Sequence, residues 1–502
     1  MIKKNTVIII ILLISIAGII LPQTLNDLDE VWNYNFARCV ADGLYPYKDF
    51  NMVQTPLLPI ICGMVLRLTS NELIAMRILA VILVTTILFV IYKILEILKI
   101  HKYIINIFMI GIYLLSYKYF RIDYNFSVLL IILLTIYFEL KNFEKCKQII
   151  KLNFKQDLLL GILVGTSILF KQTTGLFLSI IFIFYKLLLV DNKEKFKETF
   201  KIIIIRLLGV FIPIFIFVIY LIVSNTLIDF LYYTVYSLKT FSNKISYMNL
   251  LKGKYSIILS IFSVLVPITI MVTYIITICR KIKTENQNLL FIFFAYSVAS
   301  LIVIYPISDG IHFIIGSIPS IIAMFFMIWL LLNKAIQNKK IRFAIKCFLE
   351  SFTIMLILII AIYEGIILFN YLKTCNKYNQ LKHFKYIPAS YESTKKIDDF
   401  ILEENRKGKN VYILDATAAL YMIPIDKYNK NYDMFLKGNL GADGEEGQIE
   451  NLKKENDNTV VLIMNNSYSR NWQTPEKVRK YIIDNWTKRG EIEKFDIYEK
   501  EK

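Results

Sequence analysis

Residues 7–21 read VIIIILLISIAGIIL; Lys3 and Lys4 precede this run, and Asp29 and Glu30 follow it. A run of this length can cross most of a hydrocarbon core of about 30 Å, and lysines before a span are typical of the cytoplasmic side. No Ala-x-Ala pattern follows the run, so we expect a retained first membrane span and not a cleaved signal peptide. The acidic residues are then expected on the outer surface of the membrane.

The composition extends this interpretation to the whole chain. Of 502 residues, 56% are hydrophobic and the mean hydropathy is +0.53, which exceeds what the core of a water-soluble domain can bury. The formal charge of +18 could indicate nucleic-acid binding, but the basic residues lie in short loops at alternate turns between apolar runs. This placement is typical of cytoplasmic loops. We therefore expect a polytopic protein in a lipid bilayer, with no nucleic-acid partner.

The apolar runs predict about eleven spans, an odd number that leaves the N-terminus in the cytoplasm and the C-terminus outside. The expected spans are 7–22, 72–92, 104–118, 125–140, 157–170, 175–190, 202–224, 255–279, 288–305, 312–333 and 347–369. The two short runs on either side of Lys171 could also be tilted or re-entrant segments.

The chain is expected to divide into a membrane domain at 1–370, whose first outer loop is 23–70, and a polar domain at 371–502 outside the membrane. Hydrophobic periodicity in the polar part predicts alternating helices and strands, which indicates a small α/β domain. The predicted elements are a helix at 393–406, strands at 410–414 and 459–464, a helix that begins at Pro475 and that Gly490 ends, and a closing strand at 492–498.

The first outer loop gathers several acids. Asp29 and Glu30 would lie near the membrane interface, where a lipid-linked phosphate presents its sugar, and either could be the general base of a glycosyl transfer. Asp27 adds a third acid nearby. Aromatic residues, Tyr47 among them, would hold the loop at the interface, and Asp49 could orient a substrate hydroxyl or support the base. The alternative is that these acids only solvate the loop.

Another polar group is expected at the outer ends of the third and fourth spans. Lys118 or Arg121 could pair with a phosphate, and Asp123 could be a second acid, followed by Tyr124 and Asn125. The alternative for the cations is that they only reach toward the interface.

Two more groups lie at other outer span ends. Lys171 and Gln172 interrupt two apolar runs, and a lysine at that depth with no acid nearby in sequence is a candidate anion ligand. Asp309 and His312 open the tenth span and bring a carboxylate and an imidazole to the same side. A histidine at a span end can also be no more than a hydrogen-bonded interface residue.

The cysteines show no metal-binding spacing, so no zinc site is expected. A disulfide between Cys39 and Cys62 is conceivable, but two buried thiols are the favoured interpretation. Neither GxxxxGK[ST] nor GxGxxG after a strand occurs, which disfavours a soluble nucleotide-sugar donor.

Taken in order, these outer motifs resemble the membrane glycosyltransferases of the GT-C fold, which include protein O-mannosyltransferases and the lipid A aminoarabinose transferases. The likeness covers most of residues 1–370. The motifs that carry it are LDE at 28–30, DGLYPYKD at 42–49, TPL at 55–57, NELIAMR at 71–77, DYN at 123–125, KQT at 171–173, and Asp309 with His312.

The resemblance implies a GT-C-like helical membrane enzyme that moves a sugar from a polyprenyl-phosphate donor to a glycan, lipid or protein acceptor of the cell envelope, with inversion. No cofactor is expected, although some members of the superfamily are thought to use a divalent metal. The implied catalytic residues are Asp29 or Glu30 as base with Asp49 and Asp123 in support. The implied donor-phosphate ligands are Lys171, Arg121 and Gln172. The implied substrate contacts are Tyr47, Tyr124, Asn125, Asp309 and His312.

Three other classes remain open. A transporter or flippase of lipid-linked sugars would place charges near the middle of the membrane, whereas the apolar runs contain few acids. A polysaccharide polymerase or ligase would be expected to gather its polar residues in a large late loop. An inert receptor scaffold is the remaining alternative.

Overall fold

The computed structural model describes residues 4–26, 28–240, 244–279, 284–336, 338–378, 381–389, 391–428, 433–465 and 474–500. The chain forms two compact units. The first, the helical unit, comprises Met1–Ile20, Ala80–Phe217 and Lys244–Phe369. The second, the mixed unit, comprises Leu21–Leu79, Val218–Asn243 and Asn370–Lys502.

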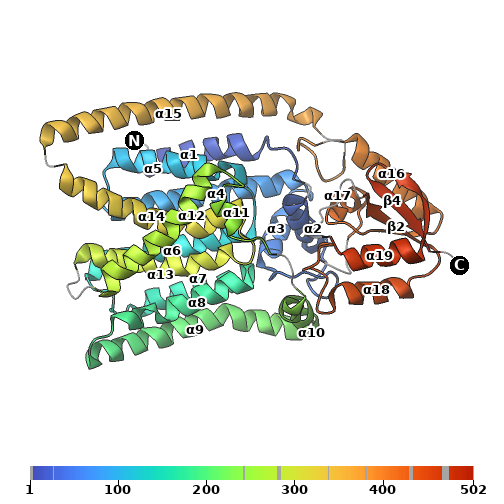
Figure 1. Ribbon diagram of the computed structural model, residues 1–502, viewed down its shortest axis with the longest axis horizontal. Coiled ribbons are helices and arrows are strands. Elements are labelled where there is room, and N and C mark those ends of the chain that lie inside the picture. The colour runs from blue at the N-terminus through green and yellow to red at the C-terminus, as the bar shows by residue number, and fades with distance from the viewer. Residues whose placement is uncertain are drawn as a thin grey trace. The chain divides into compact units, whose positions relative to one another are not determined.

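The helical unit is built from long helices that run side by side (Figure 1). They are α1 (Lys4–Ile20), most of α4 (Leu73–Ile97), α5 (Lys102–Ser116), α6 (Tyr124–Cys146), α7 (Phe154–Phe170), α8 (Gln172–Phe184), most of α9 (Lys193–Val223), α12 (Ile257–Tyr274), α13 (Glu285–Leu301), α14 (Gly310–Ala335) and most of α15 (Lys339–Thr374). Shorter turns adjoin them: η1 (Tyr117–Tyr119), η2 (Tyr185–Leu189), α11 (Met248–Leu251), η5 (Ile275–Cys279) and η6 (Ile302–Ile304).

Each of the eleven predicted spans coincides with one of these long helices. Within the described residues, eight helices are long and apolar enough to cross a membrane. The other three, α1, α5 and α7, have 17, 15 and 17 residues and fall short of the roughly 20 that a full crossing needs. A total of eleven crossings therefore stays a prediction, while the helical membrane character of the chain is clear.

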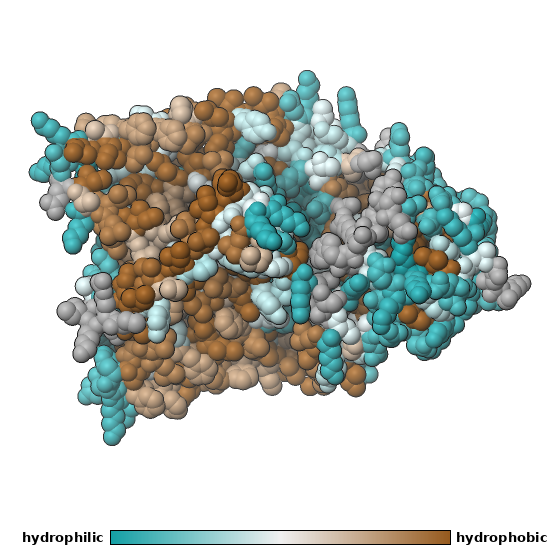
Figure 2. Space-filling model, in the orientation of Figure 1, coloured by the Kyte–Doolittle hydropathy of each residue, from teal (hydrophilic) through white to brown (hydrophobic). Residues whose placement is uncertain are grey.

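The outward faces of these helices are apolar. Leu208 and Phe215 on α9, Met271 on α12 and Leu358 on α15 are each about half exposed or more. On the face shown in Figure 2, hydrophobic residues cover the long helices. A water-soluble protein rarely exposes so large an apolar surface, whereas lipid tails contact such a surface without cost.

Four charged side chains are buried together between these helices. Arg206 of α9 donates from Nε to Asp157 of α7 at 2.8 Å and from Nη1 to the carbonyl of Phe182 at 2.7 Å, and it also pairs with Glu139 of α6. Lys186 lies 3.5 Å from Glu139, and all four ionisable side chains are 4% exposed or less. Two positive and two negative charges balance, so the network joins four elements without a net buried charge.

The mixed unit contains the first outer loop together with the polar C-terminal part. Its helices are α2 (Asp29–Ala41), α3 (Leu57–Leu68), α10 (Leu227–Phe230) with η3 (Leu231–Val235) and η4 (Tyr236–Lys239), η7 (Cys375–Lys377), α16 (Glu392–Arg406), α17 (Ala418–Met422) with η8 (Ile423–Ile425), α18 (Gly444–Lys454) and α19 (Glu476–Asn485). Its strands are β1 (Asn410–Ile413), β2 (Thr459–Met464), β3 (Thr487–Ile492) and β4 (Phe495–Glu499).

The four strands form one sheet in the order β1-β2-β4-β3, in which β1 and β2 are parallel and the other neighbours antiparallel. Every residue of β2 is buried, as expected for a central strand without alternating polarity. Val461 and Ile463 of β2 pack with Val478 and Ile482 of α19 and with Trp486 in the core.

The predicted helix at 393–406, the strands at 410–414 and 459–464 and the helix after Pro475 are all present. The prediction that Gly490 ends this helix is wrong. The helix stops at Asn485, and Gly490 lies inside β3, where the pairing with β4 shifts register after Lys488. A glycine within a strand often marks such an irregularity, so Gly490 indicates an irregular strand here and not a helix end.

We expect Arg206→Met to lower the free energy of unfolding by about 3–5 kcal/mol, because Asp157 and Glu139 would lose their shared partner while buried. Thermal unfolding of the purified chain in detergent measures this change. Lys195→Met is the control, since Lys195 is on the same helix but pairs with Asp191 at the surface. Equal stability of the two variants would contradict a structural role for the network.

Candidate functional site

The first candidate base, Glu30, is held by an arginine. Arg77 Nε lies 2.7 Å from Glu30 Oε1 and Nη2 lies 2.8 Å from Oε2, and Arg77 also donates to the carbonyls of Leu21 and Gln23. Glu30 is 8% exposed and Arg77 2%. Two charge-assisted hydrogen bonds thus engage both carboxylate oxygens of Glu30. Glu30 therefore fixes the chain where it enters α2.

The second member of the acidic pair, Asp29, is half-buried in the first turn of α2, where its charge suits the N-terminal end of a helix. Because Glu30 is committed to Arg77, Asp29 becomes the stronger candidate for a base in this loop. Asp27 lies outside the described residues.

The other two predicted loop residues shape a turn. Asp49 accepts a hydrogen bond from the backbone N–H of Tyr45 at 2.8 Å. Tyr47 is 2% exposed, donates its hydroxyl to the carbonyl of Gln54 at 2.7 Å and packs edge-on against Phe230. Both residues thus have a structural task in the mixed unit, and the Tyr47 hydroxyl is already engaged.

A carboxylate that sequence reasoning missed joins the first loop to the C-terminal part of the same unit. Asp433 is 3% exposed and accepts hydrogen bonds from Trp32 Nε1 and from the backbone N–H of Val53 at 2.7 Å. Burial raises the pKa of Asp433 to about 7, although the hydrogen bonds from Val53, Trp32 and Asn439 lower it. No local motif marks this residue, because its partners come from distant parts of the sequence.

In the helical unit, two predicted acids cap helices. Asp123 precedes α6 and accepts a hydrogen bond from the backbone N–H of Asn125 at 2.6 Å. Asp309 precedes α14 and accepts from the backbone N–H of His312 at 2.9 Å, and its Oδ1 lies 2.8 Å from His312 Nδ1. Asp and His in this spacing thus start a helix and hold a carboxylate and an imidazole together at its end.

Lys171 is the most unusual residue of this part. It lies between α7 and α8, is 9% exposed, and donates from Nζ to Asn125 Oδ1 at 2.7 Å, with Nζ 5.2 Å from the centre of the Tyr124 ring. No carboxylate of the described residues is within ion-pair distance of it. Burial lowers the pKa of Lys171 to about 8, and the more distant charges of Asp123 and Asp309 raise it. The site thus holds a cation that neutral groups alone contact directly.

Tyr119 connects this cation region to Asp309. A Cβ added at Gly310 would collide with the Tyr119 hydroxyl, so the hydroxyl packs directly on the backbone beside Asp309. Burial and the charge of Asp309 raise the pKa of Tyr119, and Arg121 lowers it, which places the half-buried Arg121 in the same electrostatic environment. We name the group of Tyr119, Asp123, Asn125, Lys171 and Asp309 the helix-end cluster.

An apolar groove of about 500 Å³ lies between α5, α12 and α14 and reaches the helix-end cluster. Its walls are mostly aliphatic and aromatic, with Leu115, Leu259 and Phe325 among them, and Lys118, Tyr119 and Tyr255 lie at the end where α5 stops and α12 begins. Tyr119 therefore lines the groove, and its hydroxyl packs on Gly310 beside Asp309.

The predicted residues thus fall into two sets. The helical unit contains Gln172, the half-buried first residue of α8. It also contains Arg121, Asp123, Tyr124, Asn125, Lys171, Asp309 and His312. Asp29, Glu30, Tyr47 and Asp49 belong to the mixed unit. The sequence did not single out Tyr119 and Tyr255, although both are tyrosines at the expected outer ends of spans, where such residues are common.

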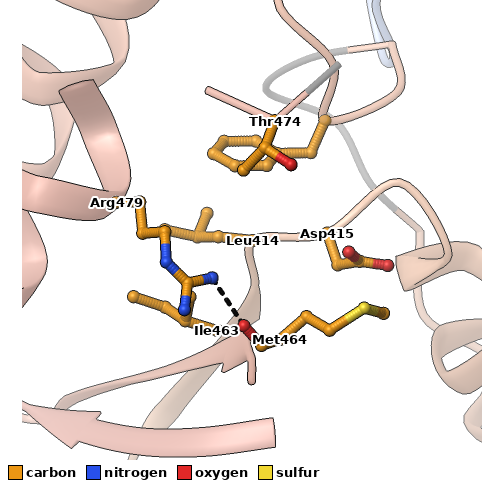
Figure 3. A pocket seen from close by; sticks show the side chains of 7 residues that line it. Leu414, Asp415, Ile463, Met464, Thr474 and Arg479 are labelled. Atoms are coloured by element: carbon orange, nitrogen blue, oxygen red, sulfur yellow. Dashed lines mark hydrogen bonds between the residues drawn. The ribbon is translucent and has the colours of Figure 1, made fainter. Parts of the chain in front are cut away.

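A small pocket in the mixed unit lies at the carboxyl ends of the parallel strands β1 and β2 (Figure 3). Arg479 donates from Nη1 to the carbonyl of Met464 at 2.5 Å, and Asp415 lies on the opposite wall. The pocket holds about 10 Å³, which is the room of about one water molecule. A sugar or a phosphate does not fit this space.

Cys39 and Cys62 are both buried and are not joined by a disulfide, in agreement with the favoured interpretation. Within the part of the chain that the structure describes, no three His, Cys, Asp or Glu side chains come together as metal ligands. The sequence matches no protein-family model, and it matches no curated protein. The functional argument therefore depends on this chain's own residues and on the resemblance of its outer motifs.

We expect Glu30→Ala to lower the free energy of unfolding by about 3–5 kcal/mol, because the buried Arg77 would lose its counter-ion. Replacing both residues, as Glu30→Leu with Arg77→Met, should restore much of the loss. Thermal unfolding in detergent measures both effects, with the exposed Glu446→Ala as control. A Glu30→Gln chain of unchanged stability would contradict the structural assignment.

Because the pKa of Asp433 is raised in the folded chain, we expect the free energy of unfolding to depend on pH. This pKa is about 7 in the folded chain and about 3.9 in an unfolded one, so the folded state binds the proton more tightly. The associated stability is complete below about pH 4 and is lost as the pH rises to about 7, on the order of 4 kcal/mol in all. The wild-type chain should therefore lose stability relative to Asp433→Asn across this window. Denaturant unfolding at pH 4, 5.5 and 7 tests this, with the exposed Asp457→Asn as control; parallel curves for wild type and Asp433→Asn would refute it.

Proposed function

We propose that this protein is a membrane glycosyltransferase of the GT-C type that takes a sugar from a polyprenyl-phosphate donor and passes it to an acceptor of the cell envelope. In this proposal the N-terminus is cytoplasmic and residues 371–502 lie outside the membrane. The observation that supports it best is that Tyr119 lines an apolar groove and packs beside Asp309, whose charge also acts on the buried Lys171.

The groove suits the prenyl chain of such a donor. Its length on α5 runs from Ile107 to Lys118, about 16 Å at 1.5 Å per residue, and its walls are apolar along this distance. An isoprenoid chain needs an apolar surface inside the membrane and a polar exit for its phosphate. Lys118, Tyr119 and Tyr255 provide polar groups at one end only, which gives the groove a direction.

Lys171 suits the donor phosphate. A buried ammonium that directly contacts only an amide and an aromatic ring is costly unless an anion completes its surroundings. A phosphate diester supplies that anion in the ground state and gains negative charge as the sugar departs. Lys171, supported by Arg121, would stabilise this charge in the transition state.

In the proposed reaction, an acceptor hydroxyl or amine attacks the anomeric carbon while the bond between this carbon and the phosphate oxygen breaks, with inversion. A base takes the acceptor proton, and polyprenyl phosphate leaves. The family resemblance assigns the base to the first outer loop, and Asp29 is the candidate there because Glu30 is engaged by Arg77. Asp309 and His312 are candidates to bind sugar hydroxyls, since the carboxylate accepts hydrogen bonds and the imidazole can accept or donate them at a helix end.

The buried charges at Arg206 favour a transporter, because intramembrane charges often mark a transport path. These charges pair with one another and leave no net charge, which fits a structural network better. Transport of lipid-linked sugars is therefore the alternative outcome of the experiment below.

We expect Lys171→Met to reduce the release of polyprenyl phosphate from polyprenyl-phosphate sugars by about 100-fold or more, since one preorganised charge is lost from the leaving group. The assay uses the full chain in lipid vesicles with a panel of sugars and acceptors. Lys346→Met, which removes an exposed lysine of α15, is the control. Ile107→Trp should slow long-chain donors more than donors with a short prenyl chain, because it fills the groove at the end away from Lys118.

Asp29→Asn in the same assay tests the assignment of the base, and this variant should abolish release while the loss of its charge at the start of α2 lowers the stability by only about 1 kcal/mol. If the wild-type chain releases no polyprenyl phosphate with any donor but moves a labelled lipid across the bilayer, the transferase proposal is overturned in favour of transport.

A further inference from the structure

A second intramembrane cavity lies in the helical unit, on another face of α5. It has a volume of about 450 Å³ and lies between α1, α4, α5 and α15. Most of its lining is aliphatic. Five polar side chains interrupt this lining along the membrane-embedded part: Ser15, Tyr92, Asn106, Tyr113 and Glu364. Such groups are costly in hydrocarbon and need partners.

Among these side chains, the carboxyl group of Glu364 is the most unfavourable to place in hydrocarbon. It lies in α15 within the apolar run 352–369, is 3% exposed, and accepts a hydrogen bond from the hydroxyl of Ser15. No cation of the described residues pairs with it. Gly18 permits this contact, since a Cβ there would come within 3.0 Å of Glu364 Cβ and 3.2 Å of its carbonyl oxygen. Helix α1 thus approaches α15 closely at the carboxylate.

Tyr113 gives an independent indication of a missing partner. This residue is 8% exposed, lines the same cavity, and its buried hydroxyl has no hydrogen-bond partner within the described residues. A buried hydroxyl without a partner loses the hydrogen bonds that water would give it, which is unfavourable. A ligand with hydrogen-bonding groups in the cavity would remove this penalty.

The helix α15 offers a route of entry from the bilayer. Its apolar residues are mostly exposed, as at Leu358, Ile362 and Ile366, so this helix packs loosely on the rest of the unit. Glu364 is six residues, about 9 Å, before Asn370, which is the polar end of the apolar run. A lipid headgroup can reach this depth, while its chain extends along α5.

We propose that this cavity binds a membrane lipid whose headgroup carries an ammonium group, with the ammonium paired to Glu364 and an acyl chain lying along α5 toward Lys102. Charge complementarity selects the headgroup, because the embedded carboxylate has a hydroxyl partner but no cation. Lys102 at the opposite end of the cavity fixes the orientation, since it repels an ammonium there. The site is separate from the groove between α5, α12 and α14, so it goes beyond the proposed transferase function.

Lipid retention by the purified full chain tests this proposal. The chain is delipidated, exchanged into mixed vesicles of equal phosphatidylethanolamine and phosphatidylglycerol, extracted, and its bound lipids are counted by native mass spectrometry. We expect the wild type to retain the ethanolamine lipid at least about tenfold over the glycerol lipid, as a charge-assisted hydrogen bond in hydrocarbon provides. Glu364→Gln should bring this ratio close to one.

Two variants control for folding and for bulk lipid. Glu350→Gln removes an exposed carboxylate from the same helix and should leave the preference unchanged. Ala361→Phe fills the cavity from the exposed side of α15 and should abolish retention of both lipids at unchanged thermal stability. A preference for phosphatidylglycerol, an equal retention of both lipids by the wild type, or a preference that persists in Glu364→Gln or Ala361→Phe would overturn the proposal.

Discussion

Hydrocarbon offers no hydrogen-bond partner to a peptide N–H or C=O, and this constraint accounts for most of the helical unit. Every segment that enters the apolar region must satisfy its backbone internally, so each folds as a helix. The first turns of a helix leave backbone N–H groups unpaired, and Asp123 and Asp309 cap two of these turns. Polar side chains therefore gather at these ends, which is why the candidate site of this unit lies there.

Because hydrocarbon also does not solvate charges, each charged side chain among the helices needs a partner, and three arrangements occur in the described residues. The four charges around Arg206 neutralise one another and fix the packing of the elements that carry them. Lys171 is buried with neutral neighbours at a helix end, and an anionic ligand would complete its surroundings. Glu364 lies inside an apolar run with one hydroxyl partner, and a cationic lipid headgroup would complete it. The two incompletely paired charges are thus the ones to which a ligand is assigned.

In the mixed unit, water can satisfy backbone groups, so the need for internal hydrogen bonds does not decide the fold. Tertiary contacts between side chains and backbone organise the chain there. Arg77 holds Glu30 and the carbonyls before α2, and Asp433 holds Trp32 and Val53. Through these contacts the first outer loop and the C-terminal part form one compact body. A loop with such defined attachments can position a side chain such as Asp29, whereas a loop that is only solvated cannot.

The sequence by itself determined the elements whose physics is local. Long apolar runs specify helices because no other structure satisfies the backbone in lipid. The short apolar run 460–464 specifies a strand. Lys171 and the acids before α6 and α14 were also found, because charges that interrupt apolar runs are conspicuous in sequence. The prediction that Gly490 ends a helix was wrong, since a glycine occurs both at helix ends and at irregularities within strands. Only the tertiary structure showed that Arg77 pairs with Glu30 and that four charges from distant segments pair with one another around Arg206. It also placed Tyr119 beside Asp309 and Ser15 beside Glu364. Such pairings depend on which helix faces pack together, and packing between segments far apart in the chain leaves no local pattern.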